Sequence, residues 1–493
     1  MKRLRILLVV GLALLLASCA VGPKYVKPTV PSTPMDTYKE LDGWETAQPN
    51  DEVIKGKWWE IFNNPQLNSL EEQVAVSNQN LKVAEARFRE ARAQVRYNRS
   101  FQFPTLAIAP SIVGERRSQN MPYFPTATYS TGDYLLPVDL SYEVDAWGRV
   151  RRTVAAAREA AQASASDLET VRLSLDAELA LDYFELRSAD AQEQLLQTTT
   201  KAFSEALQLT VNRFEGGAAP KSDVAQAQTQ LDSARVQETD VAVQRAEYEH
   251  AIAVLIGKPP AQFSLQSGPA DFKPPDISVG LPSQLLERRP DIAAAERRVA
   301  EENEQIGIAR AAYFPTVILN ATAGLESQAI ADWFTWPSLL WAVGPTIAEP
   351  IFDAGRRRAN SQAAQANYDA AVANYRQITL TAFQEVENNL AAIRILAREA
   401  QQQCDATKSA EESLRVFTNR YVGGADPYLQ VITAQTIALQ NERNDVDIAR
   451  RRMDAIILLI KALGGGWNIS QLPDAAKFNQ GKDQSQENTL GGS

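Results

Sequence analysis

Residues 212–220 read NRFEGGAAP, and residues 419–427, which lie 207 positions later, read NRYVGGADP. Each copy lies at the end of a run of 67 residues without glycine or proline, 149–215 in the first case and 356–422 in the second. A helix rises about 1.5 Å per residue, so each run predicts a rod of about 100 Å, which is too long for a globular core. The two copies therefore predict the tips of two long helical hairpins.

Each turn carries the residues that a helix reversal needs. Paired glycines are expected to supply the left-handed backbone that ends a helix, because glycine has no Cβ to clash. A proline then begins the next uninterrupted run, 220–256 or 427–463, in keeping with the preference of proline for the first turn of a helix. The turn glycines are Gly216, Gly217, Gly423 and Gly424.

Comparison at a fixed offset extends the repeat over most of the chain. The matching pairs, at offsets of 211 and then 207, are Ala84-Glu85 with Ala295-Glu296, Phe103-Pro104-Thr105 with Phe314-Pro315-Thr316, Gly148-Arg149 with Gly355-Arg356, and Gly257 with Gly464. The sequence therefore predicts an internal duplication, each half with a helix, two strands and a long helical hairpin. The helix expected over 66–100 and the returning helix would lie end to end beside the long helix.

The chain begins with the pattern of an exported lipoprotein. A basic n-region precedes an apolar run over 6–16, which is shorter than the about 20 residues of a spanning helix. LASC at 16–19 resembles the lipobox of bacterial lipoproteins, so cleavage is expected to leave Cys19 at the N-terminus with covalently attached lipid. Alanine at position 20, rather than aspartate, favours sorting to the outer membrane. The alternative is plain secretion with an incidental cysteine.

These patterns divide the chain into six parts. We expect a lipoprotein signal peptide (1–18), an N-terminal segment (19–65), the first structural repeat (66–257), a connector (258–290), the second structural repeat (291–464), and a C-terminal segment with a mobile tail (465–493).

Two stretches of alternating residues predict strands with one face toward a membrane. In 138–144 and in 317–323, apolar residues occupy every second position, as in outer-membrane barrels. A sheet packed on a soluble domain explains this alternation about equally well. An aromatic cluster, as in an interfacial girdle, consists of Trp333, Phe334, Trp336 and Trp341. Since four strands cannot close a barrel and lipid excludes open sheet edges, several chains must share one barrel, and three would supply twelve strands.

The composition argues against other classes of protein. The 493 residues carry a net charge of −10, which gives no basic face for nucleic acid. One histidine, His250, and two cysteines, Cys19 and Cys404, are too few for a zinc site or a disulfide framework. GGAAPKS at 216–222 lacks the second glycine before the lysine of a phosphate loop, and no strand precedes it. We expect no enzymatic activity, no metal and no cofactor apart from the lipid.

Together these features resemble the TolC-like outer membrane factor family, specifically its lipidated, NodT-type branch. The resemblance covers the whole mature chain and is carried by WWEIFNNPQLNSL (58–70), LPSQLLERRPDIAAAE (281–296), YFPTVIL (313–319), IFDAGRRRANSQAAQANYDAAVANYR (351–376) and ALGGGW (462–467). It implies a mixed, mainly α fold: a homotrimeric channel whose shared twelve-stranded transmembrane β-barrel continues into a long periplasmic tube of twelve helices. It also implies that an equatorial region surrounds the tube, formed by the N-terminal segment 19–65, the connector 258–290 and the C-terminal segment 465–493.

The resemblance also implies a function, a passive exit duct of a tripartite efflux or export system in the Gram-negative outer membrane. A proton-driven inner-membrane transporter would supply the energy, and a periplasmic adaptor, a membrane fusion protein, would join it to the tube. The competing hypothesis is a lipid-anchored periplasmic coiled-coil scaffold without a pore. That hypothesis explains the lipobox and the long helices, but not the alternating strands or the tryptophan cluster.

A periplasmic gate, closed by inward coiling of the tip helices, is a further implication of the resemblance. Residues that match gate positions of relatives are Asp223, Tyr421 and Leu429. Relatives place gate aspartates where this chain has Gln430 and Thr433, and one member has an arginine where this chain has Asp426. The candidate charge partners of Asp223 and Asp426 are Lys221, Arg213 and Arg420. The four turn glycines match positions where relatives meet the adaptor.

Overall fold

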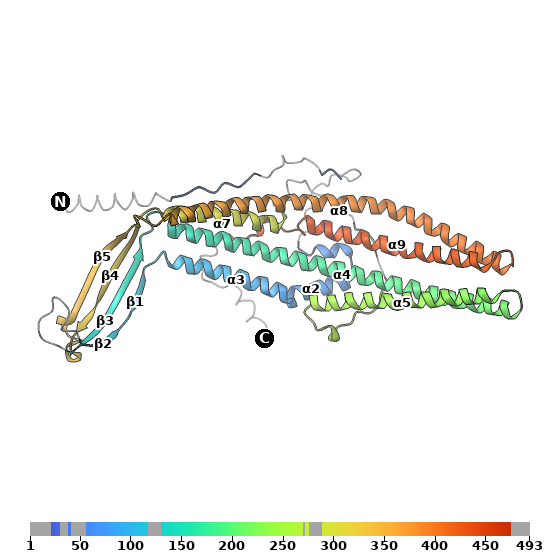
Figure 1. Cartoon of the computed structure of the whole chain (residues 1–493), viewed down its shortest axis with the longest axis horizontal. Coiled ribbons are helices and arrows are strands. Elements are labelled where there is room, and N and C mark those ends of the chain that lie inside the picture. The colour runs from blue at the N-terminus through green and yellow to red at the C-terminus, as the bar shows by residue number, and fades with distance from the viewer. Residues whose placement is uncertain are drawn as a thin grey trace.

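The computed structural model describes residues 21–29, 38–40, 56–116, 130–269, 272–275 and 288–474. The molecule is elongated, with an antiparallel sheet at one end, a long body of helices, and two hairpin tips at the other end (Figure 1). The signal peptide, Cys19, part of the connector 258–290 and the tail beyond residue 474 lie outside the described residues.

The two longest helices confirm the predicted hairpins. α4 (Arg149–Glu215) and α8 (Arg356–Val422) have 67 residues each and end at the two repeated turns. α5 (Lys221–Leu255) and α9 (Tyr428–Ala462) return along them, with 35 residues each. The turn prolines occupy the N-cap positions, one residue before the returning helices rather than inside their first turns.

The helix expected over 66–100 is in fact two helices, α2 (Pro65–Ser77) and α3 (Gln79–Ser100). Asn78 separates them because its side chain caps α3, accepting a backbone N–H at 3.0 Å. The same side chain donates to the carbonyl of the last residue of α5 at 2.8 Å. The break therefore ties the start of α3 to the end of α5.

The shorter helices flank the longer ones. α3 and α5 follow each other along α4, and α7 (Pro290–Ala311) and α9 do so along α8 (Figure 1). α7 also packs against α4, which joins the two repeats. Single turns of 3-10 helix are η1 (Trp58–Phe62), η2 (Pro260–Gln262), η3 (Ile330–Asp332), η4 (Trp336–Ser338) and η5 (Ile469–Gln471). In the part of the chain that the structure describes, no helix has the length and apolar character to cross a membrane.

The sheet has four strand positions in an antiparallel order. Its strands are β1 (Thr105–Ile108), β2 (Ser111–Arg116), β3 (Ser130–Glu143), β4 (Thr316–Ser327) and β5 (Leu339–Ala348). β1 and β2 both pair with β3 and form one interrupted edge, β4 follows β3, and β5 is the other edge. Two strand positions from each half, as predicted, thus form one sheet.

The register brings the predicted apolar positions onto one face of the sheet. One row across the strands joins Leu106, Leu140, Ala321 and Val343, and the next joins Ile108, Val138, Ala323 and Trp341. The opposite face carries polar pairs, including the hydrogen bond from the Thr322 hydroxyl to Asp139 at 2.6 Å. Alternation along each strand therefore becomes an apolar face and a polar face of the sheet.

The largest apolar core lies in the middle of the helical body, where η1, α2, α4, α5 and α9 meet. Trp58, Leu67 and Leu179 are among its fully buried side chains. Burying this surface holds the two hairpins and the segment before α2 together at one level of the body.

Residues 21–29 belong to the expected equatorial segment 19–65, but they run beside α7 and α8 toward the sheet (Figure 1). The Tyr25 hydroxyl donates to Glu296 at 2.8 Å, and the Val21 N–H donates to the Trp147 carbonyl at 3.1 Å. These contacts hold residues 21–29 along the part of the helical body between its middle and the sheet, instead of at the middle itself.

Candidate functional site at the hairpin tips

The two tips have the same backbone geometry. At the first tip the Gly217 N–H donates to the Phe214 carbonyl and the Ala218 N–H to the Arg213 carbonyl, and the second tip repeats both bonds 207 residues later. This pattern is the Schellman motif, which ends a helix with a left-handed residue. Each glycine pair supplies the expected left-handed backbone through its second member, with φ of +72° at Gly217 and +74° at Gly424, whereas the first glycine of each pair is right-handed.

Within one chain an arginine of the first tip contacts a tyrosine of the second tip. Tyr421, at the end of α8, is 4% exposed, and its ring lies 5.0 Å from the ring of Tyr428. The Arg213 guanidinium from the other hairpin sits 4.6 Å above the Tyr421 ring, and its Nη1 donates to the Val422 carbonyl at 3.0 Å. Cation–π attraction and a hydrogen bond thus link α4 to α8. We call this contact the intrachain clasp.

Asp426 does not present a free carboxylate. Arg420, six residues earlier in the same turn, donates Nε to Asp426 Oδ2 at 2.6 Å and Nη2 to Oδ1 at 3.0 Å. These bonds hold the pKa of Asp426 below its ordinary value. A bidentate pair has little net charge, so Asp426 attracts cations less than an isolated carboxylate would. Of the three candidate partners, Arg420 is the one that the structure brings to Asp426.

Asp223 lies in the first turn of α5 and is half-buried. Within the described residues it forms no ion pair with Lys221, Arg213 or Arg420, and its position at a helix N-terminus favours a negative charge. Burial first, and then the nearby charges of Tyr421 and Asp223, raise the pKa of Tyr428 to about 12. Asp223 therefore lies close to the intrachain clasp.

The remaining gate candidates lie on the exposed face of α9. Leu429 is 55% exposed, Gln430 and Thr433 are exposed, and the Thr433 hydroxyl donates to the Leu429 carbonyl at 2.9 Å. Residues four apart share a helix face, so Leu429 and Thr433 point the same way. Their assignment to a constriction stays a prediction.

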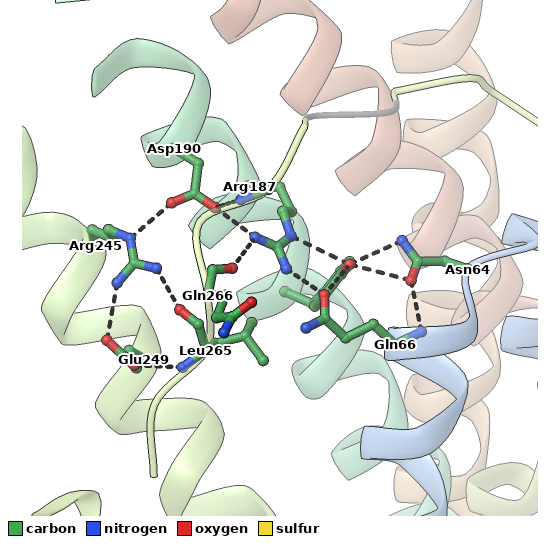
Figure 2. Close-up of polar contacts among 10 residues, drawn as sticks. Asn64, Gln66, Arg187, Asp190, Arg245, Glu249, Leu265 and Gln266 are labelled. Atoms are coloured by element: carbon green, nitrogen blue, oxygen red, sulfur yellow. Dashed lines mark hydrogen bonds and ion pairs between the residues drawn. The ribbon is translucent and has the colours of Figure 1, made fainter. Parts of the chain in front are cut away.

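Farther from the tips, a buried set of ion pairs fastens the first hairpin, and sequence reasoning missed it (Figure 2). Asp190 on α4 accepts from Arg187 Nη1 at 2.6 Å and from Arg245 Nε at 2.7 Å, and Arg245 Nη1 donates to Glu249 at 3.0 Å. We call these four residues the central ion network. A sequence signal existed, because Arg187 and Asp190 flank the apolar stripe of α4 at helical spacing.

The central ion network also holds the connector that follows α5. The Arg187 Nη1 donates to the Gln266 carbonyl at 3.0 Å, the Arg245 Nη2 donates to the Leu265 carbonyl at 2.6 Å, and the Leu265 N–H donates to Glu249 at 2.6 Å. On the other side, Arg187 bonds the Gln66 side chain at the start of α2 (Figure 2). The described residues contain no group of three His, Cys, Asp or Glu side chains placed to hold a metal ion.

Comparison with known proteins matches the chain to a protein family. The model of the outer membrane efflux protein family matches residues 70–258 and 281–465, which together exceed half of the chain. The two matched ranges contain the two repeated hairpins.

Individual relatives match over nearly the whole length. The chain is 33% identical to the probable efflux pump outer membrane protein SepC of Pseudomonas putida, over 95% of this chain and 98% of SepC. It is 32% identical to the outer membrane protein OprJ of Pseudomonas aeruginosa, over 93% of this chain and 95% of OprJ. Among solved structures, the outer-membrane channel OprN is similar with a TM-score of 0.85 and 28% identity, over 91% of this chain and 100% of OprN.

Proposed function

The chain belongs to the outer membrane efflux protein family, and from that premise we propose that three copies of it build one efflux duct. The family consists of outer-membrane channel and efflux proteins rather than enzymes. This chain is accordingly an outer-membrane efflux channel, with a helical body that extends into the periplasm. The proposal concerns its assembly, its anchor, its gate and its partners.

The sheet is the observation that carries the trimer. One chain supplies four strand positions, with β1 and β2 at one edge and β5 at the other, and no strand of the described residues covers either edge. Lipid leaves unpaired edge groups without a hydrogen-bond partner, so the edges must pair with other copies. Three chains give twelve strands, within the range of outer-membrane barrels, and the apolar rows would face lipid. The internal duplication then makes the helical tube a ring of six hairpins.

The N-terminal segment supports a lipid anchor at Cys19. The Val21 N–H bonds the Trp147 carbonyl, and Trp147 stacks on Phe314 where the sheet meets the helices. Cys19 precedes Val21 by two residues, a reach of about 7 Å at most. A lipid on Cys19 would therefore enter the inner leaflet beside the barrel, and no other cofactor is needed.

The tips support docking of a periplasmic adaptor. Among the described residues, no atom lies within 4 Å of the position that a Cβ would take at Gly217 or at Gly424, so the left-handed turns present open backbone. An adaptor hairpin could approach these turns closely, as the glycines have no side chains. Through it the duct would connect to a proton-driven inner-membrane transporter. Gly424→Trp should block efflux and leave the trimer intact.

Native mass and conductance test the proposed function. In mild detergent the full-length protein should have the mass of a trimer, and in a planar bilayer it should conduct ions. A monomer or dimer would contradict the shared barrel. A trimer without conductance would favour a periplasmic scaffold instead. Cys19→Ala should abolish labelling by radioactive fatty acid, and retained labelling would contradict the anchor.

A further inference from the structure

The trimer proposed above creates a second contact between tips, and the internal repeat predicts which residues meet there. Around a ring of six hairpins, first and second hairpins alternate, so every second boundary lies between copies. The boundary inside a chain is the intrachain clasp. α4 and α8 have the same length of 67 residues, and each residue of α4 corresponds to the residue of α8 that lies 207 positions later. Replacing each residue of the intrachain clasp by its counterpart in the other repeat therefore gives the residues expected at the boundary between copies.

At the boundary between copies, Arg420 takes the place that Arg213 has in the intrachain clasp. Its partners are then Phe214 and Glu215 of the neighbouring copy, which correspond to Tyr421 and Val422. The exposed fractions of these side chains agree with a surface that a second copy would cover. Phe214 is 42% exposed, whereas its repeat counterpart Tyr421 is 4% exposed. Glu215 is exposed and forms no ion pair within the described residues.

The neighbouring copy offers Arg420 a better site than Arg213 finds inside the chain. Arg213 gains a tyrosine ring and one backbone carbonyl. Arg420 would gain a phenylalanine ring and the Glu215 backbone carbonyl, and the Glu215 side chain adds a carboxylate at a position where the intrachain clasp has the apolar side chain of Val422. Charge-assisted hydrogen bonds are about twice as strong as neutral ones.

One substitution between the repeats opposes this contact. The first turn has Ala219 where the second has Asp426, so Arg213 has no acid at that position, and its guanidinium lies over the Tyr421 ring instead. Arg420 has Asp426, and the two form a bidentate pair. Asp426 of the same chain and Glu215 of the neighbouring copy thus compete for the Arg420 guanidinium. Both contacts are near solvent, so burial makes neither of them much stronger than the other.

We propose that Arg420 is a two-position latch of the closed tips. In one position it binds Phe214 and Glu215 of the neighbouring copy and closes the boundary between copies. In the other position it binds Asp426 of its own chain, and that boundary is free to open. Asp426 therefore acts as a competitor that eases opening, rather than as a cation-selective ring.

Cross-linking tests the geometry. In a Cys404→Ser background, Arg420→Cys with Glu215→Cys should join two copies with a short bismaleimide and give dimer and trimer bands on a denaturing gel. The matched control, Arg213→Cys with Val422→Cys, should react within one chain and give only monomer bands. If the native mass is that of a trimer but the Arg420→Cys, Glu215→Cys variant gives no cross-linked copies, the latch is contradicted while the trimer is supported. A native monomer would instead contradict the proposed function.

Conductance tests the competition. Asp426→Ala should lower the open probability of the channel in a planar bilayer about fivefold, because losing an exposed ion pair shifts a two-state equilibrium by up to about that factor. In a Phe214→Ala, Glu215→Gln background the same substitution should have no effect, since Arg420 then has no second partner. Glu412→Ala, which removes another exposed arginine pair on α8, is the matched control and should change nothing. An unchanged or higher open probability for Asp426→Ala would overturn the latch.

Discussion

The middle of the second repeat lacks the acids that fasten the first. At the positions of the central ion network, 207 residues later, the chain has Arg394, Ala397, Arg452 and Ile456, so both basic residues remain and both acids are gone. Arg394 pairs instead with Glu40, which is 354 residues away in the sequence. At these positions the arginines of the first hairpin pair with acids of their own helices, whereas Arg394 of the second hairpin pairs with an acid from the beginning of the chain.

The two fastenings also differ in burial. The side chains of Asp190 and Arg187 are 1% and 5% exposed, whereas those of Arg394 and Glu40 are 35% and 23% exposed. A buried charge that loses its partner is costly, but a partly exposed pair is screened by water. The two halves of the chain therefore have matching long helices, but their polar contacts at mid-body differ. The first hairpin should be the more rigid of the two at mid-body.

Asp190→Ala should give the largest effect. It leaves the Arg187 and Arg245 guanidinium groups without their shared carboxylate in a buried site, and breaking such a set costs about 3–5 kcal/mol. Thermal unfolding of the detergent-solubilised protein should show a clear fall in Tm.

The matched change in the second repeat is Arg394→Ala, which should lower the free energy of unfolding by about 1 kcal/mol or less. Equal losses of Tm for the two variants would remove the proposed difference between the hairpins. A larger loss for Arg394→Ala would reverse it.

Glu71, on α2 in the first half of the chain, is a buried carboxyl group of a different kind. It is fully buried in the central apolar core, and neither carboxyl oxygen has a hydrogen-bond partner among the described residues. Burial first, and then the charge of Asp176, raise its pKa to about 10. Because the folded pKa lies above the ordinary value of 4.5, folding requires a proton at neutral pH. Stability from this group is present below about pH 4.5 and is lost as the pH rises toward 10.

Glu71→Gln should therefore stabilise the protein at pH 7 by up to about 3 kcal/mol and change little at pH 5. Tm measured from pH 5 to pH 9 should fall less steeply in the variant than in the parent. Glu72→Gln, at the exposed neighbour, is the control and should keep the slope of the parent. Parallel slopes for Glu71→Gln and the parent would mean that the carboxyl is ionised in the folded state.

Much of the fold follows from local sequence signals. The runs without glycine or proline predict α4 and α8 to the residue, because nothing within them ends a helix and a Schellman turn follows. The break at Asn78 was not predictable, since asparagine inside a helical pattern becomes a cap only when its side chain also meets α5. The clasp partners were equally hidden, because Arg213 and Tyr421 are 208 residues apart and meet only through the packing of two hairpins.

At the tips, Arg213→Ala should have a moderate effect. It removes the cation–π contact with Tyr421 and the hydrogen bond to the Val422 carbonyl, together about 1 kcal/mol at a partly exposed site. The tips of one chain should separate more readily, so the closed-state leak current in a planar bilayer should increase about fivefold. Arg415 pairs with Glu412 on the same helix, so Arg415→Ala should leave the current unchanged. No increase for Arg213→Ala would show that the intrachain boundary does not take part in closure.

Tyr421→Phe should have the smallest effect. The Tyr421 hydroxyl is buried and has no hydrogen-bond partner among the described residues, so the clasp depends on the ring, which holds the Arg213 guanidinium and packs on Tyr428. Replacing an unpaired buried hydroxyl by hydrogen removes a desolvated group without loss of a bond, and the variant should match the parent within about 0.5 kcal/mol in stability and in leak current. Tyr421→Ala removes the ring and should leak as Arg213→Ala does. If Tyr421→Phe also leaked, the hydroxyl would have a partner in another copy, and the boundary inside a chain could no longer be separated from the boundary between copies.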